Sequence, residues 1–242
     1  MTLKRAFASF AALVVGLSVS QAFAATLVVD NFSNLGPIPA SNAANTWSYT
    51  APSGVLRNAR DLTKSGVSSA AVQWTTQANP GKLQFNTTTL GLTTPNNLTM
   101  HYDGTAGSGT HYFNPRVDVS GYSGGWLNVD TPSVAVGANT SAKATIQWLT
   151  AATGGTIMTS ELTLAGGPSS GGYAFKLSDF SGAITNFSLI LSVQVRLQAL
   201  GQGTTLVNSI YFANAPIPEP GTLALAGLGL VGLVIARRKK SV

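Results

Sequence analysis

Residues 186–200, NFSLILSVQVRLQAL, determine the fold class predicted for this chain. Apolar and polar side chains alternate with a period of two, so one face of an extended strand would hold Phe187, Leu189, Leu191, Val193, Val195 and Leu197. The other face would hold Ser188, Ser192, Gln194, Arg196 and Gln198, and only Ile190 interrupts the pattern. The alternation predicts a long strand with one face buried in a hydrophobic core and the other toward solvent.

Other segments of the chain alternate in the same way. AKATIQWLT would bury Ala144, Ile146 and Trp148, and LVNSIYF would bury Leu206, Ile210 and Phe212. Clusters of Gly, Pro and Asn separate the apolar runs, at residues 79–81, 94–97, 102–110, 121–125, 153–155 and 166–172. About a dozen short strands separated by such turns indicate an all-β protein. We predict an antiparallel two-sheet β-sandwich of the jelly-roll type.

The charged residues are concentrated at the two ends of the chain. The formal net charge is +6, but two cations precede residue 25, and four cations and one anion follow residue 215. Residues 25–215 therefore hold eight cations and seven anions, so the body is nearly neutral. A neutral body offers no basic face for a phosphate backbone, and we expect no nucleic-acid partner. The chain has no cysteine, so disulfides cannot stabilise it.

The N-terminus predicts export. MTLKRAFASFAALVVGLSVSQAFA has a basic start, an apolar stretch and small residues at Ala22 and Ala24. This order is typical of a secretory signal peptide spanning residues 1–24, with cleavage between Ala24 and Ala25.

The C-terminus combines three elements. Pro218, Glu219 and Pro220 precede an uncharged apolar segment at residues 221–236, which is followed by Arg237, Arg238, Lys239 and Lys240. As a helix the segment would span about 24 Å, short of the roughly 30 Å hydrocarbon core, and we predict a marginal transmembrane helix. By the positive-inside rule the cations would stay cytoplasmic as residues 237–242, leaving the body outside. The prolines favour an extended linker over residues 213–220.

This order of elements resembles the PEP-CTERM sorting signal of Gram-negative bacteria. The resemblance implies that an exosortase-type membrane protease recognises Pro218, Glu219 and Pro220, while Arg237, Arg238, Lys239 and Lys240 form the stop-transfer end. It implies transient anchoring in the inner membrane and processing on the way to the cell surface or extracellular matrix. It implies nothing about residues 25–212, which we expect to form one β-sandwich domain.

Two glycine motifs in the chain lack the context that their chemistry requires. Gly227, Gly229 and Gly232 match the dinucleotide fingerprint, but they lie within the apolar segment and no acidic residue follows them. Residues 121–125, GYSGG, match a nucleophile elbow, yet both histidines of the chain precede Ser123 and a strand and turn follow it. We interpret the first motif as membrane helix and the second as a turn.

The body offers few candidates for catalysis or metal binding. His101, Asp103 and His111 could supply metal ligands, but no further strong ligand recurs at motif spacing, and we predict no metal site. A glycosidase would need two facing carboxylates, and no local pattern pairs any of the seven acids: Asp30, Asp61, Asp103, Asp118, Asp130, Glu161 and Asp179. We therefore predict that the protein is not an enzyme.

Aromatic residues cluster among loop signals between residues 101 and 126. Exposed Tyr and Trp rings at sandwich loops can stack on flat ligands such as sugar rings. Candidate glycan contacts are Tyr102, Tyr112, Tyr122 and Trp126. The alternative is that most of these rings belong to the core.

The two ends of the body resemble the first and last strands of galactose-binding-like jelly rolls. LVVDNFS begins the body and LVNSIYF closes it. That resemblance implies a structural calcium near the termini, although Asn208 stands where an aspartate is more typical, which weakens a site through Asp30. The residues themselves predict no cofactor.

Three hypotheses for function follow. The first is an exported, non-catalytic protein of the cell surface or extracellular matrix, associated with exopolysaccharide or biofilm. The second is a glycan-binding module that uses the loop aromatics. The third is a polysaccharide-active hydrolase with scattered carboxylates.

Overall fold

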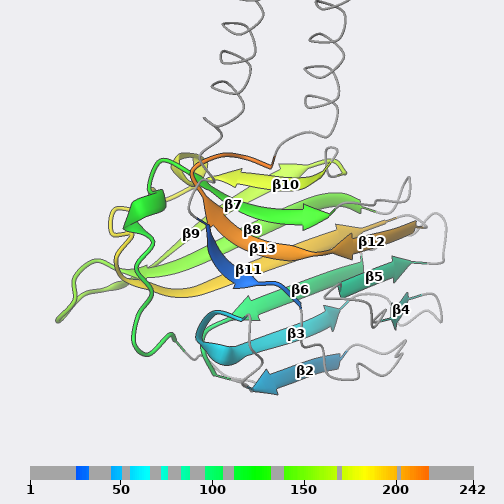
Figure 1. Ribbon diagram of the computed structural model, residues 1–242, viewed down its shortest axis with the longest axis horizontal. Helices are drawn as coiled ribbons and strands as arrows, with labels where there is room; N and C mark the ends of the chain where they lie inside the picture. Colours follow the sequence, from blue (N-terminus) through cyan, green and yellow to red (C-terminus); the bar gives the residue numbers. More distant parts are fainter. Residues whose placement is uncertain are drawn as a thin grey trace, which may run out of the picture.

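The protein is an antiparallel β-sandwich, which confirms the predicted fold class (Figure 1). The computed structural model describes residues 26–32, 45–50, 55–65, 72–75, 83–87, 96–105, 112–131, 139–167, 171–200 and 203–217. Every strand pairing within these ranges is antiparallel. The predicted signal peptide, the Pro-Glu-Pro motif, the apolar segment and the basic end lie outside the described residues.

The strands form three hydrogen-bonded sheets. The four-stranded sheet has the order β1 (Leu27–Asp30), β13 (Ser209–Ala213), β7 (Trp126–Thr131) and β10 (Gly171–Lys176). The six-stranded sheet has the order β2 (Asn45–Thr50), β3 (Ala59–Ser65), β6 (Asn96–Tyr102), β11 (Ile190–Ala199), β8 (Asn139–Leu149) and β9 (Ile157–Ala165). The three-stranded sheet has the order β12 (Gly203–Val207), β5 (Leu83–Thr87) and β4 (Val72–Thr75).

One hydrophobic core joins the three sheets. Its buried side chains include Val129 and Phe212 from the four-stranded sheet, Ile146 and Val195 from the six-stranded sheet, and Phe85 from the three-stranded sheet. Three short 3-10 helices lie in the connections: η1 (Leu56–Asn58), η2 (Ser120–Tyr122) and η3 (Leu177–Asp179). Among the described residues, no helix is long and apolar enough to cross a membrane.

The strand that defines the fold class is β11, in the middle of the six-stranded sheet. Val193, Val195 and Leu197 are buried there as predicted, while Gln194, Arg196 and Gln198 alternate with them toward solvent. The strand begins at Ile190 rather than Phe187, and its register with β8 shifts between Ile190 and Ser192. Because this bulge adds one residue, Ile190 faces the core opposite Trp148, which explains why it interrupted the sequence pattern.

The predicted strand LVNSIYF is two strands that belong to different sheets. β12 ends at Val207, Asn208 lies between the strands, and β13 begins at Ser209. Ile210 and Phe212 are buried as predicted, but the prediction for Leu206 was wrong. Val207 is the buried residue and Leu206 is half-exposed, because the break at Asn208 changes which residues face the core. The three-stranded sheet therefore continues the four-stranded sheet along one layer (Figure 1).

Three of the predicted turns overlap strands. Residues 153–155 do connect β8 to β9, but Asn96, Asn97 and Tyr102 already belong to β6, and Gly171 and Gly172 already belong to β10. Gly172 has φ 134°, and an added Cβ there would clash with the carbonyl oxygen of Val129 on β7. The glycine at this position is therefore required by close strand packing as well as by its backbone conformation.

A buried ion pair connects the four-stranded and six-stranded sheets. Asp30 ends β1, Arg60 lies on β3, and both side chains are completely buried. Nη1 of Arg60 donates to Oδ2 of Asp30 at 2.7 Å and to Oδ1 at 2.9 Å. The hydroxyl of Tyr102 on β6 donates to Oδ2 at 3.0 Å, and the backbone N–H of Phe32 donates to Oδ1 at 2.7 Å. We call Asp30, Arg60 and Tyr102 the inter-sheet triad.

Burial raises the pKa of Asp30 to about 6, and the Arg60 guanidinium limits this rise. Because the pKa is raised above its ordinary value of 3.8, the folded state holds this proton more tightly than the unfolded state. The contribution of Asp30 to the free energy of unfolding therefore falls as the pH rises from about 4 to about 6. Above about pH 6 the contribution of Asp30 to the free energy of unfolding is constant.

Each single neutralisation of the ion pair should destabilise the fold at pH 8. Asp30→Asn and Arg60→Met each leave one buried charge without its partner, a loss of about 3–5 kcal/mol in the free energy of unfolding. The double variant should recover part of that loss, because no buried charge remains. Urea unfolding measures the free energy of unfolding of the two single variants and the double variant against the wild-type protein.

The two single variants should differ in their pH dependence. Without the guanidinium, the pKa of the Asp30 carboxyl rises further, so Arg60→Met should lose less stability at pH 6, where the carboxyl takes a proton, than at pH 8. An equal loss at both pH values would show that the carboxyl does not titrate in the core.

Candidate functional site

The outer face of the six-stranded sheet is polar. A row of cross-strand partners runs from β3 to β9 through Asp61, His101, Gln194, Thr145 and Glu161. The adjacent row holds Thr63, Thr99, Arg196, Lys143 and Thr163. These residues alternate with core residues of the same strands, so their side chains lie on the face away from the core. The face thus carries hydroxyl and amide groups together with a few charges.

At the β9 side of this face the charges neutralise each other. Nζ of Lys143 pairs with Oε2 of Glu161 at 2.5 Å, and Thr145 donates to Oε1 at 3.3 Å. The hydrogen bond from Lys143 lowers the pKa of Glu161 below its ordinary value. Glu161 is therefore a stable carboxylate, poorly suited to holding a catalytic proton near neutral pH.

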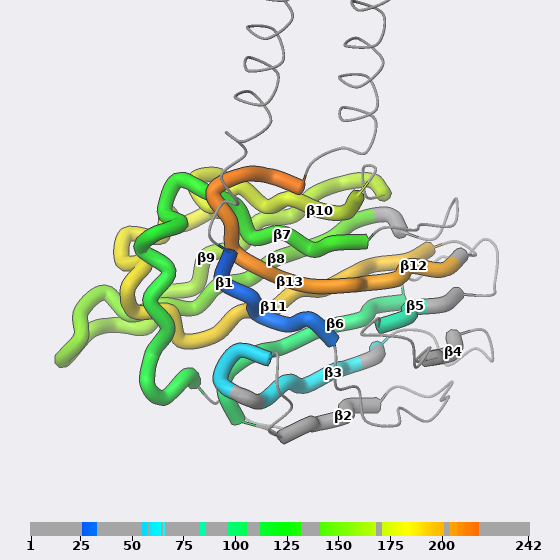
Figure 2. Tube along the Cα trace, viewed as in Figure 1, coloured from blue at the N-terminus to red at the C-terminus, as the bar shows by residue number. Residues whose placement is uncertain are grey.

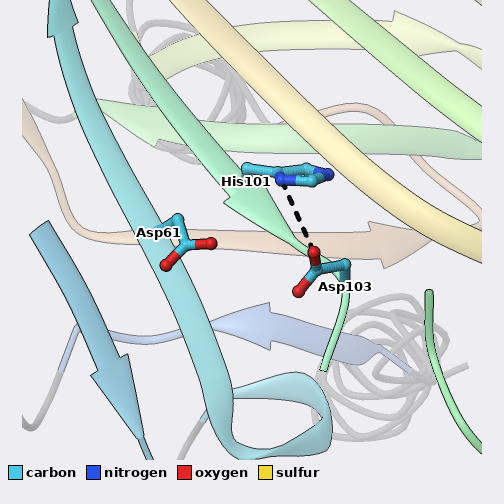
Figure 3. Close-up of side chains that lie close together, drawn as sticks. All are labelled: Asp61, His101 and Asp103. Atoms are coloured by element: carbon cyan, nitrogen blue, oxygen red, sulfur yellow. Dashed lines mark ion pairs between the residues drawn. The ribbon is translucent and has the colours of Figure 1, made fainter. Parts of the chain in front are cut away.

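At the β3 side of this face, Asp61, His101 and Asp103 come together (Figure 3). Asp61 and His101 are direct cross-strand partners on β3 and β6, and Asp103 follows the last residue of β6. Each residue offers a potential ligand atom, and these atoms lie within 4.8 Å of one another. We call these three residues the outer cluster.

A tight turn fixes the position of Asp103. Gly104 has φ 83°, and an added Cβ there would lie 3.2 Å from Cβ of Arg57 and 3.3 Å from the ring of Phe113. The backbone N–H of Thr105 donates to Oδ1 of Asp103 at 3.0 Å. Glycine therefore allows the chain to turn immediately after Asp103 while the carboxylate stays buried against the sheet.

A cleft of about 540 Å³ lies between the loop at residues 112–116 and the connection from β8 to β9. In Figure 2 these are the green segment and the yellow-green turn at the left of the molecule. The polar or aromatic residues that line the cleft include Tyr112, Asn114 and Arg116. The apolar residues that line it include Leu149, Ile157 and Leu191. The described lining contains no Asp or Glu. The cleft could therefore bind a small polar ligand, but it lacks the acids for hydrolysis.

The four aromatic residues predicted to contact a glycan lie in different environments. Tyr112 lines the cleft and is half-exposed. Tyr122 is half-exposed, with its ring centroid 6.3 Å from that of Phe212, and Trp126 is half-exposed at the start of β7. The prediction for Tyr102 was wrong, because its ring is 0% exposed and its hydroxyl donates to Asp30. Tyr102 is part of the hydrophobic core and lies on the same side of β6 as Leu98 and Met100.

The geometry at Asp30 does not fit the calcium site that the galactose-binding-like resemblance implied. Both carboxylate oxygens already accept hydrogen bonds from Arg60, and the charge is neutralised by that guanidinium. Asn208 donates instead to Oδ2 of Asp130 at 3.1 Å. Asp30 therefore stabilises the fold through Arg60 and leaves no oxygen directed at a cation.

The outer cluster was missed in the sequence because its residues come from different strands. His101 and Asp103 were considered together with His111, but Asp61 becomes their neighbour only through the pairing of β3 with β6. His111 lies outside the described residues. The predicted turn at residues 121–125 is present: η2 ends at Tyr122, and Ser123 follows it in a turn rather than at the start of a long helix.

Comparison with known proteins confirms the predicted sorting signal. Residues 216–240 match the model of a family described as the PEP-CTERM protein-sorting motif. This motif implies export, transit through the membrane and processing by an exosortase. No curated protein matches this chain.

Several solved structures share a distant likeness with the chain. The family 11 carbohydrate-binding module of the cellulosomal cellulase Lic26A-Cel5E of Clostridium thermocellum has 13% identity and a TM-score of 0.38, covering 81% of this chain and 98% of its own. The same module in complex with a beta-1,3-1,4-mixed-linked tetrasaccharide has 13% identity and a TM-score of 0.38, covering 80% and 98%. The agarase AgWH50C has 10% identity and a TM-score of 0.32, covering 80% of this chain and 25% of its own. These likenesses are too distant to assign a ligand or an activity.

Proposed function

We propose that this is an exported, non-catalytic protein of the cell surface or extracellular matrix whose β-sandwich binds a polysaccharide in the cleft beside Tyr112. The proposal combines the sorting motif with a cleft that has an aromatic and polar lining. Residues 1–24 act as the signal peptide, cleaved between Ala24 and Ala25. Pro218, Glu219 and Pro220 are the exosortase recognition residues, residues 221–236 form the transient membrane helix, and the basic end stops transfer.

The cleft beside Tyr112 is the observation that carries the sugar-binding proposal. Its volume of about 540 Å³ lies in the range of small-molecule sites, roughly 300–1,000 Å³. The half-exposed ring of Tyr112 offers an apolar face for stacking on a sugar ring. Asn114 and Arg116 are exposed and supply amide and guanidinium donors for sugar hydroxyls. A neutral polymer suits the nearly neutral body.

The hydrolase alternative has weaker support. Asp61 and Asp103 are the two acids that the outer cluster brings together, but they are only 5% and 1% exposed. A polysaccharide chain cannot reach between two carboxylates buried to that degree, and retaining or inverting hydrolysis requires the glycosidic bond to lie between them. The cleft, in its described lining, supplies no carboxylate of its own.

Removal of the Tyr112 ring should weaken polysaccharide binding. Tyr112→Ala should lower the affinity for a neutral oligosaccharide found on a glycan array by roughly two- to thirteenfold, the range expected for an aromatic contact of about 0.5–1.5 kcal/mol. Isothermal titration with wild-type and variant protein measures the change.

A matched control for this experiment is Met158→Ala. Met158 is 40% exposed beside Ile157 but does not line the cleft, so its truncation should leave the affinity unchanged. Equal affinity in wild-type and Tyr112→Ala protein, or an equal loss in both variants, would contradict the proposed site. An array without a single bound glycan would contradict sugar binding altogether.

The sorting proposal is tested separately in the host. Deletion of the exosortase should leave the chain with its C-terminal segment attached and retained in the membrane fraction, since the recognition residues would no longer be processed. Mass spectrometry of the C-terminus and cell fractionation measure the result. Glu219→Ala should reproduce it in a host with the enzyme, and an unchanged mass and location in both cases would contradict the proposal.

A further inference from the structure

The outer cluster brings two carboxylates and one imidazole together on the outer face of the six-stranded sheet. Asp61 and His101 face away from the core because Leu62, Met100 and Tyr102, their neighbours along the strands, face into it. The side chain of Asp103 is 1% exposed, Asp61 is 5% exposed, and His101 is 22% exposed. Two acids are thus withdrawn from water beside a single partly accessible imidazole.

The carboxylate of Asp103 has one oxygen without a hydrogen bond. Oδ1 accepts from the backbone N–H of Thr105, but Oδ2 has no donor within hydrogen-bond distance among the described residues. Oδ2 faces Nδ1 of His101, and the dashed line in Figure 3 marks this pair. Their separation of 3.8 Å is beyond the distance of a hydrogen bond. A buried carboxylate oxygen without a donor is costly, so a hydrogen-bond donor or a cation bound at this position would stabilise it.

The spacing of the three side chains suits a metal ion. Their potential ligand atoms lie within 4.8 Å of one another. An ion bound at about 2.0–2.2 Å by nitrogen and oxygen ligands holds those atoms within roughly 4 Å of each other, close to the spacing already present. A divalent charge would balance the two carboxylates when the imidazole is neutral, which is the form that binds metal.

The chemistry of the donors selects the kind of ion. Calcium and magnesium prefer ligand sets made of oxygen alone, whereas an imidazole nitrogen favours first-row transition metals such as zinc. We propose that Asp61, His101 and Asp103 bind one divalent transition-metal ion on the outer face of the six-stranded sheet. The ion ties β3 to the turn that follows β6, and its remaining coordination positions are open to water or to an external ligand.

Titration of the full-length purified protein with Zn²⁺ tests this site. Isothermal calorimetry should give one Zn²⁺ per chain, and Co²⁺ should give a visible absorption band that Zn²⁺ abolishes. Asp61→Asn, His101→Ala and Asp103→Asn should each weaken Zn²⁺ binding by at least about tenfold. Even the mutation of a residue that only hydrogen-bonds to a metal ligand lowers metal affinity about 10–100-fold. Ca²⁺ should bind far more weakly than Zn²⁺.

Matched controls use the other histidine of the chain and an exposed acid. His111→Ala and Asp118→Asn should bind Zn²⁺ as wild-type protein does. His101→Gln serves as a second variant, and the unfolding midpoint without metal shows that each variant folds. Absence of Zn²⁺ binding, unchanged binding in folded His101→Ala, or loss in His111→Ala alone would overturn the proposal.

Discussion

The inter-sheet triad is the interaction on which the sandwich depends most. Asp30 comes from the first described strand of one sheet, and Arg60 and Tyr102 come from adjacent strands of the other. Two opposite charges without water must remain together, since separating them would leave each charge uncompensated in the core. The surrounding apolar contacts could accommodate small shifts between sheets. The ion pair cannot accommodate such shifts, so it sets the relative position of the two layers at this end of the molecule.

The same two strands present different chemistry on their two faces. Arg60 and Asp61 are consecutive on β3, and His101, Tyr102 and Asp103 are consecutive at the end of β6. Strand alternation sends Arg60 and Tyr102 inward to Asp30, while Asp61 and His101 point outward. The inter-sheet triad therefore supports the backbone from which the outer cluster projects, and the geometry of one group depends on the geometry of the other.

The fold class could be predicted because a period of two is a local property of the chain, and β11 and β8 show it clearly. The bulge at Ile190 and the break at Asn208 could not be predicted, because each depends on how a strand pairs with its neighbour. Tyr102 was assigned to a loop surface, although its spacing from Leu98 and Met100 indicated the core. Asp61 entered the outer cluster only through strand pairing, which a single sequence does not reveal.

The place of the last strand has a mechanical consequence. β13 lies between β1 and β7, antiparallel to both (Figure 2). Asn128 on β7 donates to the carbonyl of Ala215, just beyond β13, at 3.0 Å. The sorting motif at residues 216–240 follows this strand closely in the sequence. Tension applied to the C-terminal end therefore reaches β13, which hydrogen bonds hold on both flanks. A last strand at the edge of the sheet would be held on one flank alone.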